Sequence, residues 1–526
     1  MKKPAAYISL IFPPLLLAIG CMAVYPFYRH YIDPDAVAYL TLSKRYAAGD
    51  VLIAVNGYWS PWSCWLTAGL IKQGLEAFKA ALIINAIGAM AFLIAAQVLF
   101  VRFIKDRITS GALSATLALF LVYALFKQSF ADLWYVFFLM VALLLMLQKK
   151  FLNRPVLWII AGTCGAFAYF AKAYAFPYFI GSTMVVVALL VKQKNAAFSI
   201  REWLKVAGVM LLCFFIISAP WLWMLHEKYH VWTTSTSGSL NLSWYLIGHP
   251  FFKEGITLLI PPVYPDAVYY WEDPFLVNGA APHFWHSPKL LLMQIVRAGY
   301  TVLKFVNSIN ELSAFFSLII GIAIAIVFSK KIRAFFSREL YILCVVFLLF
   351  PMGYWLINFE SRYLWYWLPL SMVIGALLIG RLDGLFPNKK IRYGILTLFC
   401  ISYLIFPVWD MKALYRVGEK EFQLAQELKK ENISGSFASN IYQLTPMQKV
   451  IRVAYFSENS FYYMPWPPQN KQEFLHELRR YQVHYYFHFH EPFEGENSQF
   501  TDENGMPFPL VFEDNVLLGL RVYKLR

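Results

Sequence analysis

Charged side chains are scarce in this chain. Lys, Arg, Asp and Glu make up 15% of its 526 residues, whereas hydrophobic residues make up 59%, and the mean hydropathy is +0.52. A soluble protein of this length could not bury so much apolar surface in domains of ordinary size. The composition therefore predicts helices that lie in lipid, each with about 20 mainly apolar residues to cross a hydrocarbon core about 30 Å thick.

Cysteine is also scarce, and its six positions show no paired spacing. Disulfide frameworks and zinc knuckles both need cysteines at short, regular intervals. Most of these cysteines lie inside apolar runs, where a free thiol packs as a small hydrophobic side chain. The sequence therefore indicates neither a disulfide scaffold nor a cysteine-bound metal.

About eleven apolar runs are expected to form spanning helices. They lie at about 7–27, 78–101, 110–126, 133–147, 155–171, 174–191, 204–225, 312–328, 340–358, 363–380 and 393–409. The first run has no small-residue cleavage site before the aromatic, proline-containing stretch 25–28, so we expect an uncleaved helix rather than a signal peptide.

Lys and Arg gather in the connections on one side of these runs. The basic clusters lie at 2–3, 102–107, 149–154, 192–205, 330–338 and 381–392. The facing connection 226–288 holds only two basic residues against five acidic ones. Because basic loops stay in the cytoplasm, we expect a cytoplasmic N-terminus and external segments at 28–77 and 226–311. This distribution also argues against nucleic acid as a partner, despite the net charge of +15.

The composition becomes mixed and charged after Trp409. Hydrophobic periodicity predicts helices at 419–431 and 471–481 and strands at 435–439, 483–489 and 517–525. We therefore divide the chain into a transmembrane domain, 1–409, and a small soluble α/β domain, 410–526, on the outer, periplasmic side.

Two carboxylates, Asp33 and Asp35, directly follow the first apolar run, with Pro34 between them. The proline stiffens this turn, and Asp35 is well placed to cap the helix that follows. Helix capping and solvation would explain the presence of both carboxylates without a catalytic role for either. Composition alone leaves this structural interpretation open.

Short motifs along the chain resemble the GT-C superfamily of membrane glycosyltransferases. The likeness is to the branch with protein O-mannosyltransferases and lipid A aminoarabinose transferases. The motifs are Asp-x-x-x-Tyr from Asp35, Gly-Asp at 49–50, Ser-Pro-x-x-x-Trp-Leu from Ser60, Phe-Ala-Lys-Ala-Tyr from Phe170, and Glu-x-Arg-Tyr from Glu360 with Leu-Pro at 368–369. The motifs follow the order found in that superfamily, and all are expected on the same side of the membrane. Together they imply a GT-C-like polytopic α-helical membrane fold.

The resemblance implies an enzyme of the cytoplasmic (inner) membrane that transfers a sugar from a polyprenyl-phosphate donor to an acceptor at the outer face. The acceptor would be a glycolipid, a glycan or a protein. In these enzymes an aspartate of the first external loop is the general base toward the acceptor hydroxyl, and Asp35 holds that position. Asp33 is then a second-choice base, or a neighbour that raises the pKa of Asp35 through like charge.

The leaving phosphate needs cations, and the resemblance assigns this role to Lys172 and Arg362, with Glu360 and Tyr363 in the same donor site. Snorkelling of Lys172 at the interface and pairing of Arg362 with Glu360 stay open as structural explanations. The aminoarabinose transferases carry Glu-Lys-Pro-Pro where this chain has Tyr-Trp-Ser-Pro at 58–61. Their phosphate-binding lysine is absent here, which weakens the inference that this chain uses the same donor or acceptor as they do.

Aromatic and acidic residues of the external segments are candidates for binding the sugar or the acceptor: Tyr39, Trp59, Glu272, Asp273 and His283. Indole and phenol rings stack on the apolar faces of sugars, and carboxylates accept hydrogen bonds from hydroxyls. An aromatic belt at the membrane interface is the alternative for most of the tryptophans.

His226 and His230 match the zinc-protease pattern His-Glu-x-x-His. The pair follows an apolar run directly, where polar residues commonly mark a helix end, and no third ligand is evident. We therefore assign no cofactor to the protein from its sequence. A divalent metal at this pair, with His283 or Glu272, stays an alternative.

A transporter or flippase for a lipid-linked sugar is the alternative function. Such proteins show inverted repeats, broken helices and charged residues near the bilayer midplane. This sequence shows no internal repeat, and its external ionisable residues gather at the membrane surface. That asymmetry favours an outward-facing enzyme.

Overall fold

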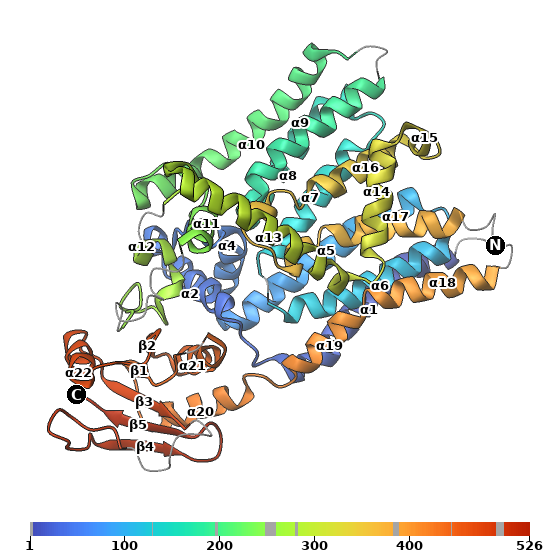
Figure 1. The fold of residues 1–526 in the computed structure, drawn as a ribbon. Helices are drawn as coiled ribbons and strands as arrows, with labels where there is room; N and C mark the ends of the chain where they lie inside the picture. Colours follow the sequence, from blue (N-terminus) through green and yellow to red (C-terminus); the bar gives the residue numbers. More distant parts are fainter. Residues whose placement is uncertain are drawn as a thin grey trace.

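The computed structural model describes residues 4–128, 130–194, 198–247, 259–278, 282–381, 389–442, 444–490 and 499–526. Figure 1 shows a bundle of helices with a small sheet domain at one end and the N-terminus at the opposite end. The bundle helices are α1 (Pro4–Tyr28), α5 (Ala77–Phe103), α6 (Arg107–Phe126), α7 (Asp132–Met146), α8 (Pro155–Ala171), α9 (Ala175–Lys194), α10 (Ile200–Tyr229), α13 (Pro288–Leu312), α14 (Phe316–Phe328), α16 (Arg338–Leu349), α17 (Trp367–Arg381), α18 (Lys389–Ser402) and α19 (Ile405–Leu414).

Seven helical stretches within the described residues are long and apolar enough to cross a membrane, and α13 with α14 makes an eighth if this pair, bent by 113°, is one span. The shorter apolar helices α7, α8 and α17 coincide with three further predicted runs. Each of the eleven predicted runs therefore overlaps a helix. The chain is a multi-pass membrane protein, as its composition predicted.

Lipid is the solvent that the outer faces of these helices require. On α5, Ile87, Ile94 and Val101 are about half exposed, whereas Phe92 and Phe100 are fully buried in the bundle. The exposed residues recur every seventh position and so share one face of the helix. An apolar face of this length stays soluble only in hydrocarbon.

The two segments that we expect to be external contain short helices. The first forms α2 (Pro34–Ala48), α3 (Val51–Ala54) and α4 (Pro61–Ile71), and α2 is mostly buried against α4 and the C-terminal domain. The second forms α11 (Ser237–Ile247), α12 (Pro274–Asn278) and α13. Helix α13 escaped prediction because Arg297 and Lys304 interrupt its apolar stripe.

The C-terminal domain is a five-stranded mixed sheet with the order β2-β1-β3-β5-β4. Its elements are α20 (Glu419–Lys430), β1 (Ser436–Ser439), α21 (Leu444–Ser457), β2 (Ser460–Tyr462), α22 (Lys471–Arg480), β3 (Tyr485–Phe489), β4 (Leu510–Asp514) and β5 (Leu520–Lys524). β1 is parallel to β2 and β3, whereas β5 is antiparallel to β3 and β4. The predicted boundary at 409 falls inside α19.

Two helices and three strands of this domain match their predicted positions, but α21, β2 and β4 were not predicted. α21 has a readable stripe, because Met447, Val450, Ile451 and Ala454 are buried at helical spacing. The domain packs directly on the external segments: the backbone N–H of Phe461 donates to the carbonyl of Val268 at 2.7 Å.

Candidate active site

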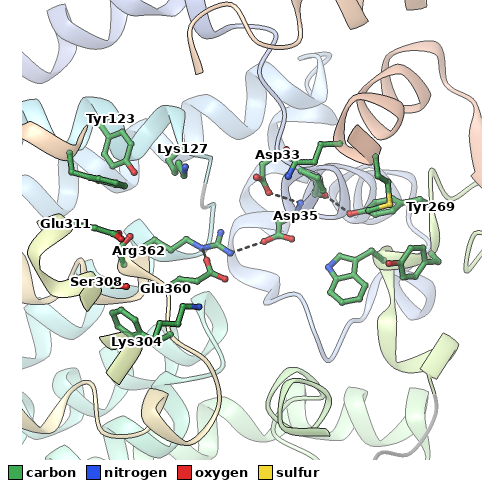
Figure 2. Close-up of a pocket in the computed structure, with 18 residues that line it drawn as sticks. Asp33, Asp35, Tyr123, Lys127, Tyr269, Lys304, Ser308, Glu311, Glu360 and Arg362 are labelled. Atoms are coloured by element: carbon green, nitrogen blue, oxygen red, sulfur yellow. Dashed lines mark hydrogen bonds and ion pairs between the residues drawn. The ribbon is translucent and has the colours of Figure 1, made fainter. Parts of the chain in front are cut away.

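The turn between α1 and α2 separates the roles of its two carboxylates. Asp33, not Asp35, is the N-cap of α2, because its side chain accepts a hydrogen bond of 2.9 Å from the backbone N–H of Asp35. The predicted cap was therefore displaced by two positions, since Pro34 occupies the first helical turn. The carboxylate of Asp35 points instead toward Arg362, with 3.0 Å between Oδ2 and Nη2 (Figure 2).

Arg362 lies on a short 3-10 helix, Ser361–Leu364, between α16 and α17. Its Nε lies 2.6 Å from Oε2 of Glu360, whose other carboxylate oxygen accepts a 3.2 Å hydrogen bond from the hydroxyl of Tyr363. The pairing with Glu360 that the sequence left open is thus present. It does not exclude a second role, because the same guanidinium also reaches Asp35.

Lys172 follows α8 directly and joins the same cluster. Its ammonium forms an ion pair with Asp132 at the start of α7 and lies 4.0 Å from the centre of the Tyr363 ring. Asp132 is almost fully buried. Lys172 is therefore directed into the protein rather than outward along the membrane surface. The motif residues Asp35, Lys172 and Arg362 meet in one cluster.

Two cavities meet at this cluster. The Lys304 cavity, about 680 Å³, is lined by Asp33, Pro34, Asp35, Tyr123, Lys127, Tyr269, Lys304, Ser308, Glu311, Glu360, Arg362, Met447 and Gln448, among others (Figure 2). The Lys172 cavity, about 550 Å³, is lined by Asp35, Tyr39, Tyr58, Trp59, Gln128, Asp132, Lys172, Thr234, Ser235, Ser237, Ser239, Asn241, Glu360, Arg362 and Tyr363, among others. Asp35, Glu360, Arg362 and Trp271 line both.

The electrostatics of the cluster favour a carboxyl group that can gain and lose a proton near neutral pH. Burial, and next the negative charge of Asp33, raise the pKa of Asp35 to about 6, although Arg362 opposes the shift. Burial acts in the same direction on Glu360, but the positive charge of Arg362 outweighs it and holds the pKa of Glu360 below its usual value. Of these two carboxyl groups, Asp35 is therefore the one whose pKa is shifted toward neutral pH.

The other candidate side chains divide between the cavity and the protein interior. Tyr39 and Trp59 line the Lys172 cavity with their ring centres 5.3 Å apart. Among the described residues, Glu272, Asp273 and His283 line neither cavity. Glu272 and Asp273 are fully buried.

Glu272 and Asp273 take part in ion pairs instead. Glu272 pairs with Arg45 of α2 at 3.2 Å, and Asp273 pairs with Lys228 of α10 at 2.8 Å. The first contact joins the 226–311 segment to α2, and the second joins it to the end of the bundle helix α10. His283 stacks on Trp285. The geometry thus supports a structural role for Glu272 and Asp273.

The His226 and His230 pair does not share an uninterrupted helix face. His230 has a left-handed backbone, with φ of 57°, and ends α10. The His226 ring stacks on Trp232 with 4.2 Å between ring centres. In the described part of the chain, no group of three or more His, Cys, Asp or Glu side chains is arranged to hold a metal ion.

Several lining residues were missed by the sequence argument. Asp132 is a lone carboxylate at the start of an apolar run, which is a readable sign of function in a membrane helix. The hydroxyl-rich stretch 234–241 and the Lys304 face of α13 carry no motif. Met447 and Gln448 reach the Lys304 cavity from the C-terminal domain, and no local pattern places them there.

No protein-family model and no curated protein sequence matches the chain. Solved structures do. ArnT from Cupriavidus metallidurans bound to undecaprenyl phosphate matches 100% of this chain and 98% of its own, with a TM-score of 0.55 and 9% identity. Its apo structure matches 99% and 98%, with a TM-score of 0.53 and 11% identity.

The oligosaccharyltransferase of Archaeoglobus fulgidus in complex with Zn and sulfate matches 90% of this chain and 68% of its own, with a TM-score of 0.53 and 13% identity. These similarities confirm the predicted fold class, a polytopic α-helical membrane protein, and the chain carries the predicted small α/β region at its C-terminal end. At such low identity they show the fold alone.

Proposed function

We propose that this protein is a glycosyltransferase that moves one sugar from a polyprenyl-phosphate donor to an acceptor hydroxyl. The observation that carries the proposal is the meeting of two cavities at the Asp35–Arg362 pair. A transferase must bring two substrates to one reacting centre. Here a proton acceptor and a phosphate-binding cation stand together where the two spaces join.

The donor occupies the Lys172 cavity in this proposal. Lys172 supplies a point charge and Arg362 a planar fork, and both suit the oxygens of a phosphate. The hydroxyls and amides of 234–241 and the rings of Tyr39 and Trp59 offer hydrogen bonds and stacking faces for a sugar. The similarity in fold to a protein that binds undecaprenyl phosphate supports a lipid-linked donor.

The acceptor enters through the Lys304 cavity and presents a hydroxyl to Asp35. Asp35 takes the hydroxyl proton while the oxygen attacks the anomeric carbon. The bond from that carbon to the phosphate oxygen breaks, and its electron pair leaves with the phosphate. Lys172 and Arg362 stabilise the charge that develops there. A direct displacement of this kind inverts the anomeric centre.

The reaction takes place at the outer face of the cytoplasmic membrane. The basic clusters lie at the ends of α5, α7, α9, α14 and α17 and at the starts of the helices that follow them. Asp132, Lys172 and Arg362 lie at the opposite ends of α7, α8 and α17. Because basic residues are kept in the cytoplasm, the site faces outward, and the acceptor is a glycolipid, a glycan or a protein there.

The test is a transfer assay with the purified full-length protein, labelled polyprenyl-phosphate sugars and extracted envelope lipids, glycans or proteins as acceptors. Asp35→Asn should lower transfer by about 10²- to 10⁴-fold, the usual effect of losing a general base. Glu458→Gln, which removes an exposed carboxylate of the C-terminal domain, is the matched control. Each assay is run with and without EDTA, since one protein of similar fold was crystallised with Zn. Transfer by Asp35→Asn at the wild-type rate would refute the role of Asp35 as the base, and no transfer by the wild-type protein with any of these donors and acceptors would refute the proposed function.

A further inference from the structure

The backbone of Tyr31–Asp35, which carries the proposed base, is held from three directions by buried side chains. The first is Gln128, just beyond α6. Its side-chain amide donates to the carbonyl of Tyr31, and its Oε1 accepts from the N–H of Asp33 at 3.1 Å. Gln128 is 2% exposed and has a left-handed backbone, with φ of 58°. One side chain therefore binds the turn on both sides of Ile32.

The second side chain comes from the second external segment. The hydroxyl of Tyr269 donates to the carbonyl of Pro34 at 2.7 Å, and Tyr269 is 1% exposed (Figure 2). Pro34 has no N–H of its own, and its carbonyl belongs to the first turn of α2. The contact therefore fixes the peptide unit that leads directly into Asp35.

The third side chain comes from the C-terminal domain. Arg452 of α21 is 4% exposed and binds Oε1 of Glu421 through Nε at 3.0 Å and Nη2 at 2.9 Å. Its remaining nitrogen, Nη1, lies 3.5 Å from the carbonyl oxygen of Ile32. A carbonyl that is buried away from water needs such a donor. The domain thus satisfies a backbone group of the turn, although Arg452 and Ile32 are 420 positions apart.

The start of α20 approaches the same turn closely. Gly418 has φ of 89°, and a Cβ at this position would lie 1.9 Å from the carbonyl oxygen of His30. Phe422, one helical turn later, stacks on the His30 ring with 4.4 Å between ring centres. Only glycine fits such a close approach with a positive φ. The C-terminal domain is therefore packed against the turn rather than tethered beside it.

We propose that Gln128, Tyr269 and Arg452 are positioning residues that hold the Tyr31–Asp35 turn in place, so that the C-terminal domain is part of the catalytic site. The inference rests on the proposed function, because it concerns the orientation of Asp35 during transfer. Four backbone groups of the turn are hydrogen-bonded to these side chains, namely the carbonyls of Tyr31, Ile32 and Pro34 and the N–H of Asp33. The backbone that carries Asp35 is therefore held in one position before substrates bind. Displacing a reacting group by about 1 Å can cost about 10²-fold in rate.

The test uses three single variants of the full-length protein: Tyr269→Phe, Gln128→Met and Arg452→Lys. Tyr269→Phe removes one hydroxyl and keeps the ring. Each variant should lower kcat by about tenfold, because the base is no longer held in line. The donor KM should stay unchanged in Tyr269→Phe and Arg452→Lys, because neither residue lines the Lys172 cavity. Gln128 lines that cavity, so Gln128→Met is judged on kcat. Thermal unfolding in detergent is measured alongside.

Two control variants make the result specific. Tyr403→Phe removes a buried hydroxyl whose 2.9 Å hydrogen bond to Ser371 lies inside the bundle. Arg521→Lys alters the 2.8 Å ion pair with Glu513 in the sheet of the C-terminal domain. Both should keep the wild-type kcat, even where they lower the unfolding temperature as much as the three test variants do.

The outcomes separate this inference from the function on which it rests. Wild-type kcat in all three test variants, with Asp35→Asn inactive, would overturn the positioning role and leave the proposed function standing. A fall in kcat matched by the controls at equal loss of stability would also overturn it. Wild-type transfer by Asp35→Asn would remove the base role of Asp35, on which the inference rests, whereas no transfer by the wild-type protein with any lipid-linked sugar would remove the proposed function itself. A fall in kcat in the test variants alone, with an unchanged donor KM in Tyr269→Phe and Arg452→Lys, supports the inference.

Discussion

Arg362 and Asp35 are 327 positions apart in the chain, yet Nη2 of one lies 3.0 Å from Oδ2 of the other. The same guanidinium binds Glu360 at 2.6 Å. One cation therefore neutralises the proposed base and belongs to the proposed phosphate site. A phosphate oxygen that draws Arg362 toward the Lys172 cavity would weaken its hold on Asp35. Donor binding and base activation would thus be linked through a single side chain.

The rate of transfer should depend on the protonation of Asp35. A base acts in its charged form, and its pKa is raised to about 6 by burial and by Asp33. The kcat/KM of the wild-type protein should therefore rise with pH up to about 6 and level off above it. Asp33→Asn keeps the helix cap, since Asn caps as well as Asp, but removes the negative charge. Its pH profile should shift to lower pH, and an unshifted profile would contradict the like-charge effect.

Arg362→Gln should impair both proposed roles of this side chain, which are binding of the donor phosphate and neutralisation of Asp35. The donor KM should rise by about 10- to 100-fold, the usual worth of a hydrogen bond to a charged group. The pKa of Asp35 should move further upward, because its neutralising partner is gone, so the profile should shift to higher pH. Arg362→Lys should restore the pH profile better than the donor KM, since lysine keeps the charge but not the fork. Parallel recovery of both would argue against bidentate phosphate binding.

The Lys172–Asp132 pair allows stability and catalysis to be measured separately. Lys172→Met leaves the buried Asp132 carboxylate without this cation and should destabilise the protein by about 3–5 kcal/mol, as breaking buried ion pairs does. The double variant Lys172→Met with Asp132→Asn removes both charges and should recover much of that stability. It should nevertheless stay inactive with the lipid-linked donor. Recovery of transfer in the double variant would show that Lys172 serves folding alone.

The partition of substrates between the two cavities can be tested at Lys304. This exposed residue of α13 lines one cavity only. Lys304→Glu should change the KM for the acceptor by a few-fold, consistent with the modest energies of exposed charges, and leave the donor KM unaltered. Ser237→Ala, in the lining of the other cavity, should do the reverse. An effect of Lys304→Glu on the donor KM would mean that the cavities are assigned the wrong way round.

Much of the architecture could be predicted because its cause is local. Length and hydrophobicity alone indicate a spanning segment, and each of the predicted apolar runs overlaps a helix. Asp35, Lys172 and Arg362 were selected differently, by the family resemblance of the short motifs that contain them. Local hydrophobic periodicity also predicted the positions of α20, α22 and the strands β1, β3 and β5.

Other features depend on contacts that no local pattern contains. Asp132 pairs with Lys172, and Glu272 is buried against Arg45. Each of these is a choice between partners that lie far apart in the chain.

The sequence by itself determined that this is a multi-pass membrane protein with polar groups gathered at one membrane surface. A hydrocarbon core imposes that outcome on any chain with such apolar runs. Only the tertiary structure decided that Asp35 faces Arg362 across the junction of two cavities and that Arg452 of the C-terminal domain reaches the turn before it. A buried charge or backbone carbonyl without a partner costs free energy, so each one must be paired. The packing of the chain determines which partner lies within reach.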